Sequence, residues 1–279
     1  MAYEDYLAGE KLIITVAPTG GVHGKEANPN LPEQPDEIAD QVRECEREGA
    51  AIVHLHGRDE RGERDVGRLQ AIDDAVRETC EDIVIQNTTG GTGLALEERR
   101  KGIETDPLPE MASLDMGPLN RYEHITTENT RYQYRTLAEE MQRKGIKPEL
   151  EVFNQGHLNE AYDLIDDGPV DPPYYVNLIF GPGTLTIPTP ENFINMVNNL
   201  PDGAVFNTMA LGPHQLPMTT LSIIAGGHVR VGFEDNLYLS RNEPATTNAQ
   251  LVRRTAEIAR SLNREIATPA EARSILDLE

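Results

Sequence analysis

Short apolar runs rich in β-branched residues alternate along the chain with longer segments that carry apolar residues at helical spacing. The short runs predict strands at 11–17, 51–56, 83–87, 111–114, 149–153, 174–180, 204–208 and 229–233. The longer segments predict helices at 36–48, 67–79, 96–102, 129–144, 157–167, 190–199, 213–225 and 246–261, then a short terminal helix near 268–276. Regular alternation is typical of a parallel sheet, and eight strand–helix units favour a closed (β/α)8 barrel over an open doubly wound sheet. We therefore expect an α/β protein with the TIM-barrel fold, in which residues 1–279 form a single domain with a short C-terminal helical extension.

Polar residues gather where the predicted strands end. In such barrels the active site lies at the C-terminal ends of the strands. The clusters found there are Thr19-Gly20, His54 with His56, Thr88-Thr89-Gly90-Gly91, Ser113, Glu151 and Glu234-Asp235. We expect them to surround one site, where loop glycines let backbone N–H groups approach a ligand.

Two of these clusters could bind one metal ion. Residues two apart in a strand point to the same side, so His54 and His56 can hold one ion together. Glu234 can supply a third ligand, because only the first strand separates the second and eighth strands of a closed ring. Two histidines and one glutamate with an open fourth position are typical of a catalytic zinc site. The alternative is a pair of hydrogen-bonded core histidines.

Two further inward side chains are candidates for catalysis. Residues 230, 232 and 234 share one face of a strand, so we expect Arg230 to lie inward, below Glu234. It either contacts substrate or forms a structural ion pair, with Asp235 as a possible partner. Glu151 ends the strand across the barrel and is a candidate general base, with a structural hydrogen-bonding role as the alternative.

The sequence disfavours two other kinds of chemistry. No serine lies in a G-x-S-x-G motif, and none of the five lysines follows a predicted strand, which argues against a Schiff-base aldolase. Zinc with an open position polarises a carbonyl or activates water. Lewis-acid chemistry on a carbonyl is therefore favoured.

Composition and charge limit the partners. The formal charge is −22, from 47 acids against 25 bases, which argues against nucleic acid or an anionic membrane as a partner. Lysine is scarce and acids dominate the outer helix faces, which suggests a protein that works in high salt, as in a halophile. Cys45 and Cys80 have no C-x-x-C partner and are expected as buried small hydrophobes in a reduced compartment. Without a predicted signal peptide or membrane span, we expect a cytoplasmic protein.

Several motifs together resemble the β-keto acid cleavage enzyme family. They extend from Leu12 to Leu278 and read ITVAPTGG, NPNLP, HLHGRD, TTGG, PEMASL, ELEVF, GGHVRVGFEDN and TPAEARSIL. The resemblance implies a zinc-dependent (β/α)8 barrel, commonly a homotetramer. It also implies a reaction that condenses a β-keto acid with acetyl-CoA to give acetoacetate and a new acyl-CoA.

The resemblance assigns roles motif by motif. It implies three zinc ligands, His54, His56 and Glu234. It implies three catalytic residues, Glu151 and the Arg230–Asp235 pair. It implies that Thr88 or Thr89 binds the carboxylate of the keto acid, with Ser113 as a second contact. Thr19 and Gly90 are also expected to bind the substrate. Gly21-Val22-His23 stands where the family often carries an acid, so the pocket for the substrate side chain differs here.

Other interpretations remain open from the sequence. A zinc hydrolase with a His-x-His barrel would usually add histidines after strands 5 and 6, whereas here His157 lies past strand 5 and no histidine ends strand 6. A non-catalytic metal or carboxylate binder is a third possibility. Because an acidic protein repels anionic substrates, we also expect a locally positive mouth, with Arg58 either contributing or serving as a solvated loop residue.

Overall fold

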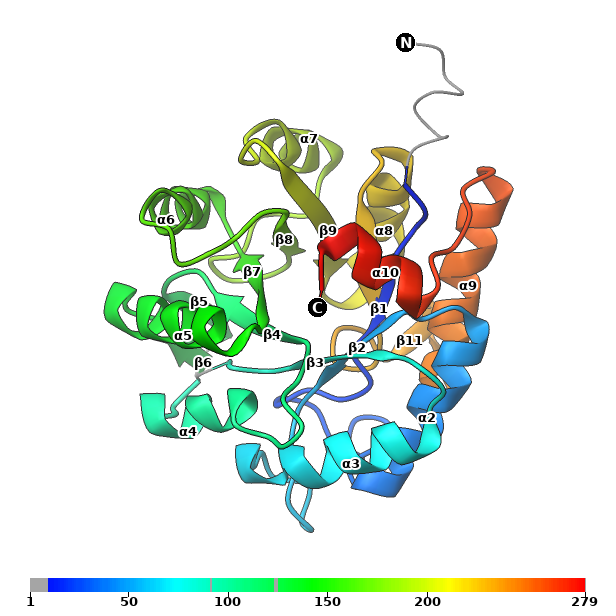
Figure 1. Cartoon of the computed structure of the whole chain (residues 1–279). Helices are drawn as coiled ribbons and strands as arrows, with labels where there is room; N and C mark the ends of the chain where they lie inside the picture. The colour runs from blue at the N-terminus through cyan, green and yellow to red at the C-terminus, as the bar shows by residue number, and fades with distance from the viewer. Residues whose placement is uncertain (1–9, 91, 123–124, 279) are drawn as a thin grey trace.

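The computed structural model describes residues 10–90, 92–122 and 125–278, and it shows a closed barrel of parallel strands surrounded by helices (Figure 1). The barrel strands are β1 (Ile14–Val16), β2 (Ile52–Leu55), β3 (Val84–Asn87), β4 (Met111–Asp115), β7 (Lys147–Val152), β8 (Tyr174–Phe180), β9 (Ala204–Ala210) and β10 (His228–Val231). Their order around the ring is β1-β10-β9-β8-β7-β4-β3-β2, so the first and last barrel strands are neighbours. The predicted TIM-barrel fold is confirmed.

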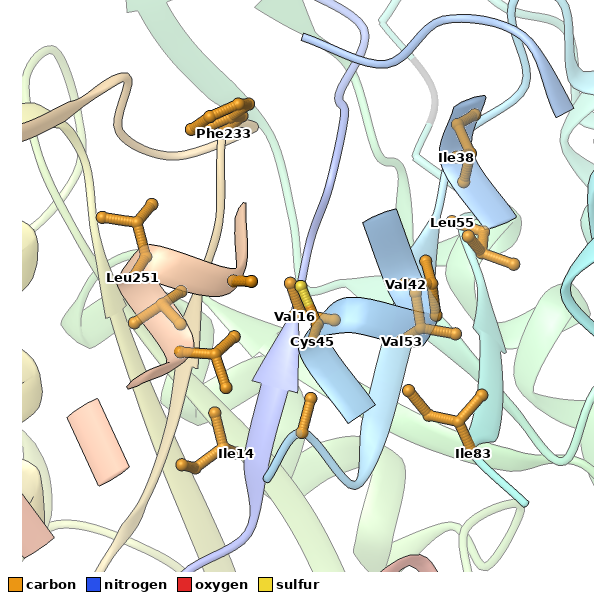
Figure 2. Close-up of a cluster of buried hydrophobic side chains, with 14 of the residues drawn as sticks. Ile14, Val16, Ile38, Val42, Cys45, Val53, Leu55, Ile83, Phe233 and Leu251 are labelled. Carbon is orange, nitrogen blue, oxygen red and sulfur yellow. The ribbon is translucent and has the colours of Figure 1, made fainter. Parts of the chain in front are cut away.

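Amphipathic helices follow the strands along the chain. They are α2 (Pro35–Glu48), α3 (Leu69–Thr79), α4 (Leu96–Arg100), α5 (Arg131–Lys144), α6 (Gln155–Asp166), α7 (Pro190–Asn198), α8 (Gln215–Ile224), α9 (Asn248–Ser261) and α10 (Pro269–Leu276). A buried cluster joins Val16 and Val53 of the strands to Val42 and Cys45 of α2 and Leu251 of α9 (Figure 2). Burying each such side chain stabilises the fold by roughly 1.5–3 kcal/mol, which fixes the strands that carry the polar clusters.

The two cysteines are both free thiols. Cys45 is buried on α2, as expected, whereas Cys80 follows α3 and is only partly buried. Burial raises the pKa of the Cys80 thiol to about 12, so it stays protonated at neutral pH.

Helix α10 covers the N-terminal end of the barrel, and Figure 1 shows it lying across the ring. Its Ala272 and Leu276 are buried against Ile13, Ala51 and other residues of the barrel floor. The chain reaches this position by pairing with the entry to β1, where the N–H of Leu12 donates to Glu265 O at 2.8 Å and the N–H of Ala267 donates to Leu12 O at 2.9 Å. The polar clusters lie at the other end, where the strands finish.

Two small hairpins were not predicted. One pairs β5 (Leu119–Tyr122) with β6 (Ile125–Thr127), and the other pairs β11 (Tyr238–Ser240) with β12 (Glu243–Pro244). Both lie outside the barrel sheet and lack the apolar alternation of a half-buried strand, which is why the pattern did not mark them. Gly91 of the expected Thr88–Gly91 cluster lies outside the described residues.

The last barrel strand is shorter than predicted, and Gly232 is the reason. β10 ends at Val231, and Gly232 has φ +146°, a conformation that L side chains rarely adopt. A Cβ at this position would lie 2.1 Å from the carbonyl oxygen of Ala17. The chain therefore turns immediately after the strand, where the N–H groups of Asp235 and Asn236 donate to Gly232 O at 3.2 and 3.0 Å.

Candidate active site

Three ligand atoms converge at the C-terminal ends of β2 and β10. His54 Nε2 lies 3.2 Å from His56 Nε2, and Glu234 Oε1 lies 3.2 Å from His56 Nε2. All three ligand atoms lie within 4.8 Å of one another. Gln86 Oε1 accepts a hydrogen bond from His54 Nδ1 at 2.7 Å, which assigns the proton to Nδ1 and leaves a lone pair on Nε2.

The electrostatics of this group favour a bound cation. Burial, followed by the charge of Arg230, lowers the pKa of His54 to about 3, so the imidazole is neutral and can act as a ligand. Although burial opposes ionisation, the charge of Arg230 holds the pKa of Glu234 well below its usual range. Glu234 Oε2 is buried and has no hydrogen-bond partner among the described residues. Two imidazole nitrogens and one carboxylate with an orphaned oxygen form a donor set that fits zinc.

Gly20 provides the space that Glu234 occupies. A Cβ at Gly20 would lie 2.4 Å from Glu234 Cγ, so a side chain at this position would displace the carboxylate. The backbone fixes the same contact, because the N–H of Glu234 donates to Ala17 O at 3.1 Å. The loop after β1 therefore positions Glu234, one of the three candidate metal ligands.

Arg230 is buried and bound by three carboxylates. Its Nη2 lies 2.7 Å from Glu234 Oε1, its Nε 3.1 Å from Asp235 Oδ2, and its Nη1 3.3 Å from Glu151 Oε1. The expected pairing with Asp235 is present, but strand alternation was the wrong reason for placing Glu234 beside Arg230. Adjacent residues of a strand point to opposite faces, yet Glu234 and Asp235 both contact Arg230, because the turn at Gly232 reorients them.

Glu151 has a second acidic partner that sequence reasoning missed. It lies on β7 beside Asp115, the last residue of β4, and the two are paired in the barrel register. Burial, with a hydrogen bond from Asp115 as the next cause, raises the pKa of Glu151 well above its usual value. Asp115 Oδ2 also accepts from Asn129 Nδ2 at 3.1 Å. The signal for Asp115 was available, because an acid directly after an apolar strand is the criterion that selected Glu151 and Glu234.

A cavity of about 790 Å3 opens above these groups. Of the expected substrate contacts, Thr88 and Gly90 line it. The hydroxyl of Thr88 accepts from the N–H of Gly90 at 3.0 Å, which leaves its own proton to donate to a ligand.

The other three expected contacts do not line this cavity. The Thr89 hydroxyl donates to Ser113 O at 2.5 Å, and the N–H of Thr89 donates to Ser113 Oγ at 3.2 Å. Thr19 accepts from Arg58 Nε at 3.1 Å. Because their hydroxyl groups are directed at protein atoms, this placement favours a supporting role for Thr19, Thr89 and Ser113 over the direct contact expected from sequence.

Arg58 is neither a residue of the mouth nor solvated. It is 4% exposed, and its guanidinium donates to the carbonyl oxygens of Gly20, His23 and Gly62. It fastens the loop after β1 to the loop after β2. Two other arginines line the cavity: Arg230, and Arg64, whose Nη2 donates to Thr92 O at 2.6 Å.

His157 lies past the fifth barrel strand, where a zinc hydrolase would need an additional histidine ligand, but it is directed at other groups. Its Nδ1 accepts from the N–H of Phe153 at 3.4 Å and its Nε2 lies 3.3 Å from Pro118 O. It is not among the residues that line the cavity or form the metal-binding group. The geometry therefore gives the hydrolase interpretation no additional metal ligand from α6.

Comparisons with known proteins agree with this arrangement. The sequence profile of the beta-keto acid cleavage enzyme family matches residues 11–278. The 3-keto-5-aminohexanoate cleavage enzymes of Acetoanaerobium sticklandii and Fusobacterium nucleatum are each 37% identical, covering 96% and 97% of this chain and 99% of theirs. The 3-dehydrocarnitine:acetyl-CoA trimethylamine transferase of Rhizobium meliloti is 31% identical over 96% of this chain and 97% of its own.

Solved structures agree in fold. Apo ObcA has a TM-score of 0.78 at 19% sequence identity, covering 90% of this chain and 66% of ObcA. Type I 3-dehydroquinate dehydratase of Clostridium difficile has a TM-score of 0.56 at 9% identity, covering 92% of this chain and 95% of the other. Across the described residues, no helix combines the length and the apolar character needed to cross a membrane. From the profile match and the 37% identical relatives, we conclude that this chain belongs to the β-keto acid cleavage enzyme family.

Proposed function

We propose that this protein transfers an acyl group from a β-keto acid to coenzyme A, with acetyl-CoA as co-substrate and acetoacetate as the second product. The observation that carries the proposal is the convergence of His54, His56 and Glu234 in a cavity that also holds Arg230 and Glu151. The names of the relatives support it, since they describe cleavage of a keto acid or transfer involving acetyl-CoA. Zinc is the proposed metal because the donor set suits it.

The reaction begins with a proton transfer that can be assigned to a residue of the chain. Glu151 accepts a proton from C2 of the keto acid, and the electron pair left on C2 attacks the carbonyl carbon of acetyl-CoA. The C–S bond of the thioester breaks and coenzyme A leaves as a thiolate. The thiolate then adds to C3 of the condensed acid, the C2–C3 bond breaks, and C2 takes the proton back. The products are acetoacetate and the new acyl-CoA.

The remaining residues bind and orient the substrate. A zinc ion, when bound, would supply Lewis-acid polarisation of the carbonyl oxygens of the keto acid. Thr88 donates its hydroxyl proton to the carboxylate of the acid. Arg230, held on three sides by Glu151, Glu234 and Asp235, fixes the general base and a metal ligand in one geometry.

The test is an assay of the zinc-loaded protein with a panel of β-keto acids, with and without acetyl-CoA. We expect acetoacetate to form only when the thioester is present. His56→Ala should lose both bound zinc and activity, whereas His214→Ala, which removes an exposed histidine, should retain both. Turnover without thioester would instead identify a hydrolase, and full activity in His56→Ala would remove the metal from the mechanism.

A further inference from the structure

The cavity has two chemically different walls. The metal-binding histidines come from β2, which lies four places from β8 in the ring of eight strands and therefore on the opposite side. The wall facing them is formed by Phe153 after β7, Ile179 on β8, Met209 on β9 and Leu211 after β9. All four are apolar.

This apolar wall is tightly packed from behind. Phe153, Ile179 and Met209 are 2%, 1% and 5% exposed and form one buried cluster with Leu119 and Leu185. The packing leaves little spare volume, since a Cβ at Gly181 would lie 3.0 Å from Leu185 and 3.1 Å from Leu211. A wall fixed in this way cannot rearrange to present a polar group to a ligand.

The strands and the turn that supply most of this wall contribute no charged side chain to the cavity. The described lining residues contributed by β8, β9 and the turn after β9 are all uncharged: Ile179, Met209, Leu211, Gly212 and Pro213. Glu234 and Asp235 are bound to Arg230, and Glu151 to Arg230 and Asp115. Arg64 reaches the cavity from the loop after β2, where it contacts Thr92. A charge placed against the apolar wall would thus be desolvated without a counterion.

We propose that the substrate is a β-keto acid whose substituent beyond C3 is an uncharged aliphatic chain. The proposal rests on the proposed function, because that function directs the carboxylate and keto oxygens of the acid toward Thr88 and the metal-binding group. The rest of the substrate then extends across the cavity to Phe153, Ile179 and Met209. The 37% identical relatives are named for an amino-substituted acid, and this wall offers no carboxylate to an ammonium group.

The experiment compares three acids at saturating acetyl-CoA: 3-oxohexanoate, 5-amino-3-oxohexanoate and 3-oxoadipate. The first two share a carbon skeleton and differ by the ammonium group. We expect kcat/KM for 3-oxohexanoate to exceed that for either charged acid by at least roughly tenfold. In a second series of longer unbranched 3-oxo acids, kcat/KM should rise about fourfold for each added methylene until the wall is covered. Equal or better use of a charged acid would overturn the inference while leaving the proposed function in place. Turnover of none of the acids would overturn both.

Met209→Glu tests the wall directly. It places a carboxylate among the apolar side chains, so the ratio of kcat/KM for 3-oxohexanoate to that for 5-amino-3-oxohexanoate should fall by roughly tenfold or more. Met209→Gln should lower kcat/KM for 3-oxohexanoate, yet 3-oxohexanoate should remain the better substrate of the two acids. This uncharged variant tests the wall if Met209→Glu does not fold. Ile187→Glu adds the same charge at a side chain that is 66% exposed and should leave the ratio unchanged.

A different occupant of the wall would give a different result. Met209→Glu could instead raise the KM for acetyl-CoA and leave the ratio of kcat/KM for the two acids unchanged. The wall would then bind part of coenzyme A, and the inference would be wrong.

Discussion

At the scale of single residues, the site depends on residues that set the tautomer, the position or the protonation of a neighbouring side chain. Gln86 sets the tautomer of His54, Gly20 makes room for Glu234, and Asp115 hydrogen-bonds Glu151. A general base that is buried beside a second acid keeps its proton to higher pH than an ordinary glutamate, because the ionised form is disfavoured. The acid side of the pH–rate profile therefore reports on this pair.

We expect Asp115→Asn to move the acid limb of kcat/KM to lower pH. The carboxyl of Asp115 raises the pKa of Glu151, so its removal lets Glu151 ionise at a lower pH, and an asparagine N–H stabilises the ionised form. The plateau value should stay within about tenfold of wild type, because the hydrogen bond is kept. The measurement is the pH dependence of kcat/KM; a limb that does not move, or moves upward, would show that Glu151 is not the base.

The three residues of the candidate metal site could be selected from sequence because each signal lies within one strand or directly after it: His54 and His56 share a strand face, and Glu234 follows an apolar strand. The pairing of Gln86 with His54 and of Asp115 with Glu151 could not be predicted, although Asp115 itself met the criterion of an acid after an apolar strand, because pairing depends on the register between strands. His54 pairs with Gln86 across β2 and β3, and Asp115 pairs with Glu151 across β4 and β7. No spacing within one strand encodes that alignment.

At the scale of elements, all eight barrel strands lie where the apolar runs placed them, because burial on both faces leaves a strong pattern. The apolar runs do not predict the directions of side chains just past the ends of the strands. Thr19 and Thr89 fulfilled the sequence criterion, yet their hydroxyl groups bond to the protein. Once a strand ends, turns decide where a side chain points, and β10 with its turn at Gly232 is the clearest example.

We expect Gly232→Ala to destabilise the protein far more than Gly226→Ala. Both glycines have positive φ, but a Cβ at Gly226 meets nothing within 4 Å, whereas one at Gly232 meets the backbone of Ala17. Urea unfolding should show a loss of roughly 1 kcal/mol for Gly226→Ala and about 3–5 kcal/mol for Gly232→Ala. Equal losses would show that the close approach to Ala17 is relieved without cost.

At the scale of the whole molecule, charge is the dominant unusual feature. Ion pairs such as Lys11–Glu265 and Arg131–Glu160 include an exposed cation and contribute little to stability, because water and salt screen them. With 47 acids against 25 bases, net repulsion outweighs them at low salt. Work in high salt, a cytoplasmic location and assembly as a homotetramer stay predictions, and the first of them can be tested on the isolated protein.

We expect the melting temperature to rise by roughly 5–10 °C between about 0.1 M and 2 M KCl, as the screening length shortens from about 10 Å to below 3 Å. Differential scanning calorimetry measures this directly. Sorbitol at matched osmolality controls for general solvent effects and should produce a smaller rise. A melting temperature that is flat or falls with KCl would contradict a salt-adapted surface.

The position of α10 has a consequence for biosynthesis. On the ribosome this helix is made after every strand that it covers, so the barrel floor at Ile13, Ala51 and Tyr175 stays uncovered while the rest of the nascent chain is being made. Since Ala267 also pairs with Leu12, the same late segment fixes the entry to β1. Nascent chains stalled before residue 269 should therefore recruit chaperones and be degraded faster than full-length protein, even though they already carry His54, His56 and Glu234.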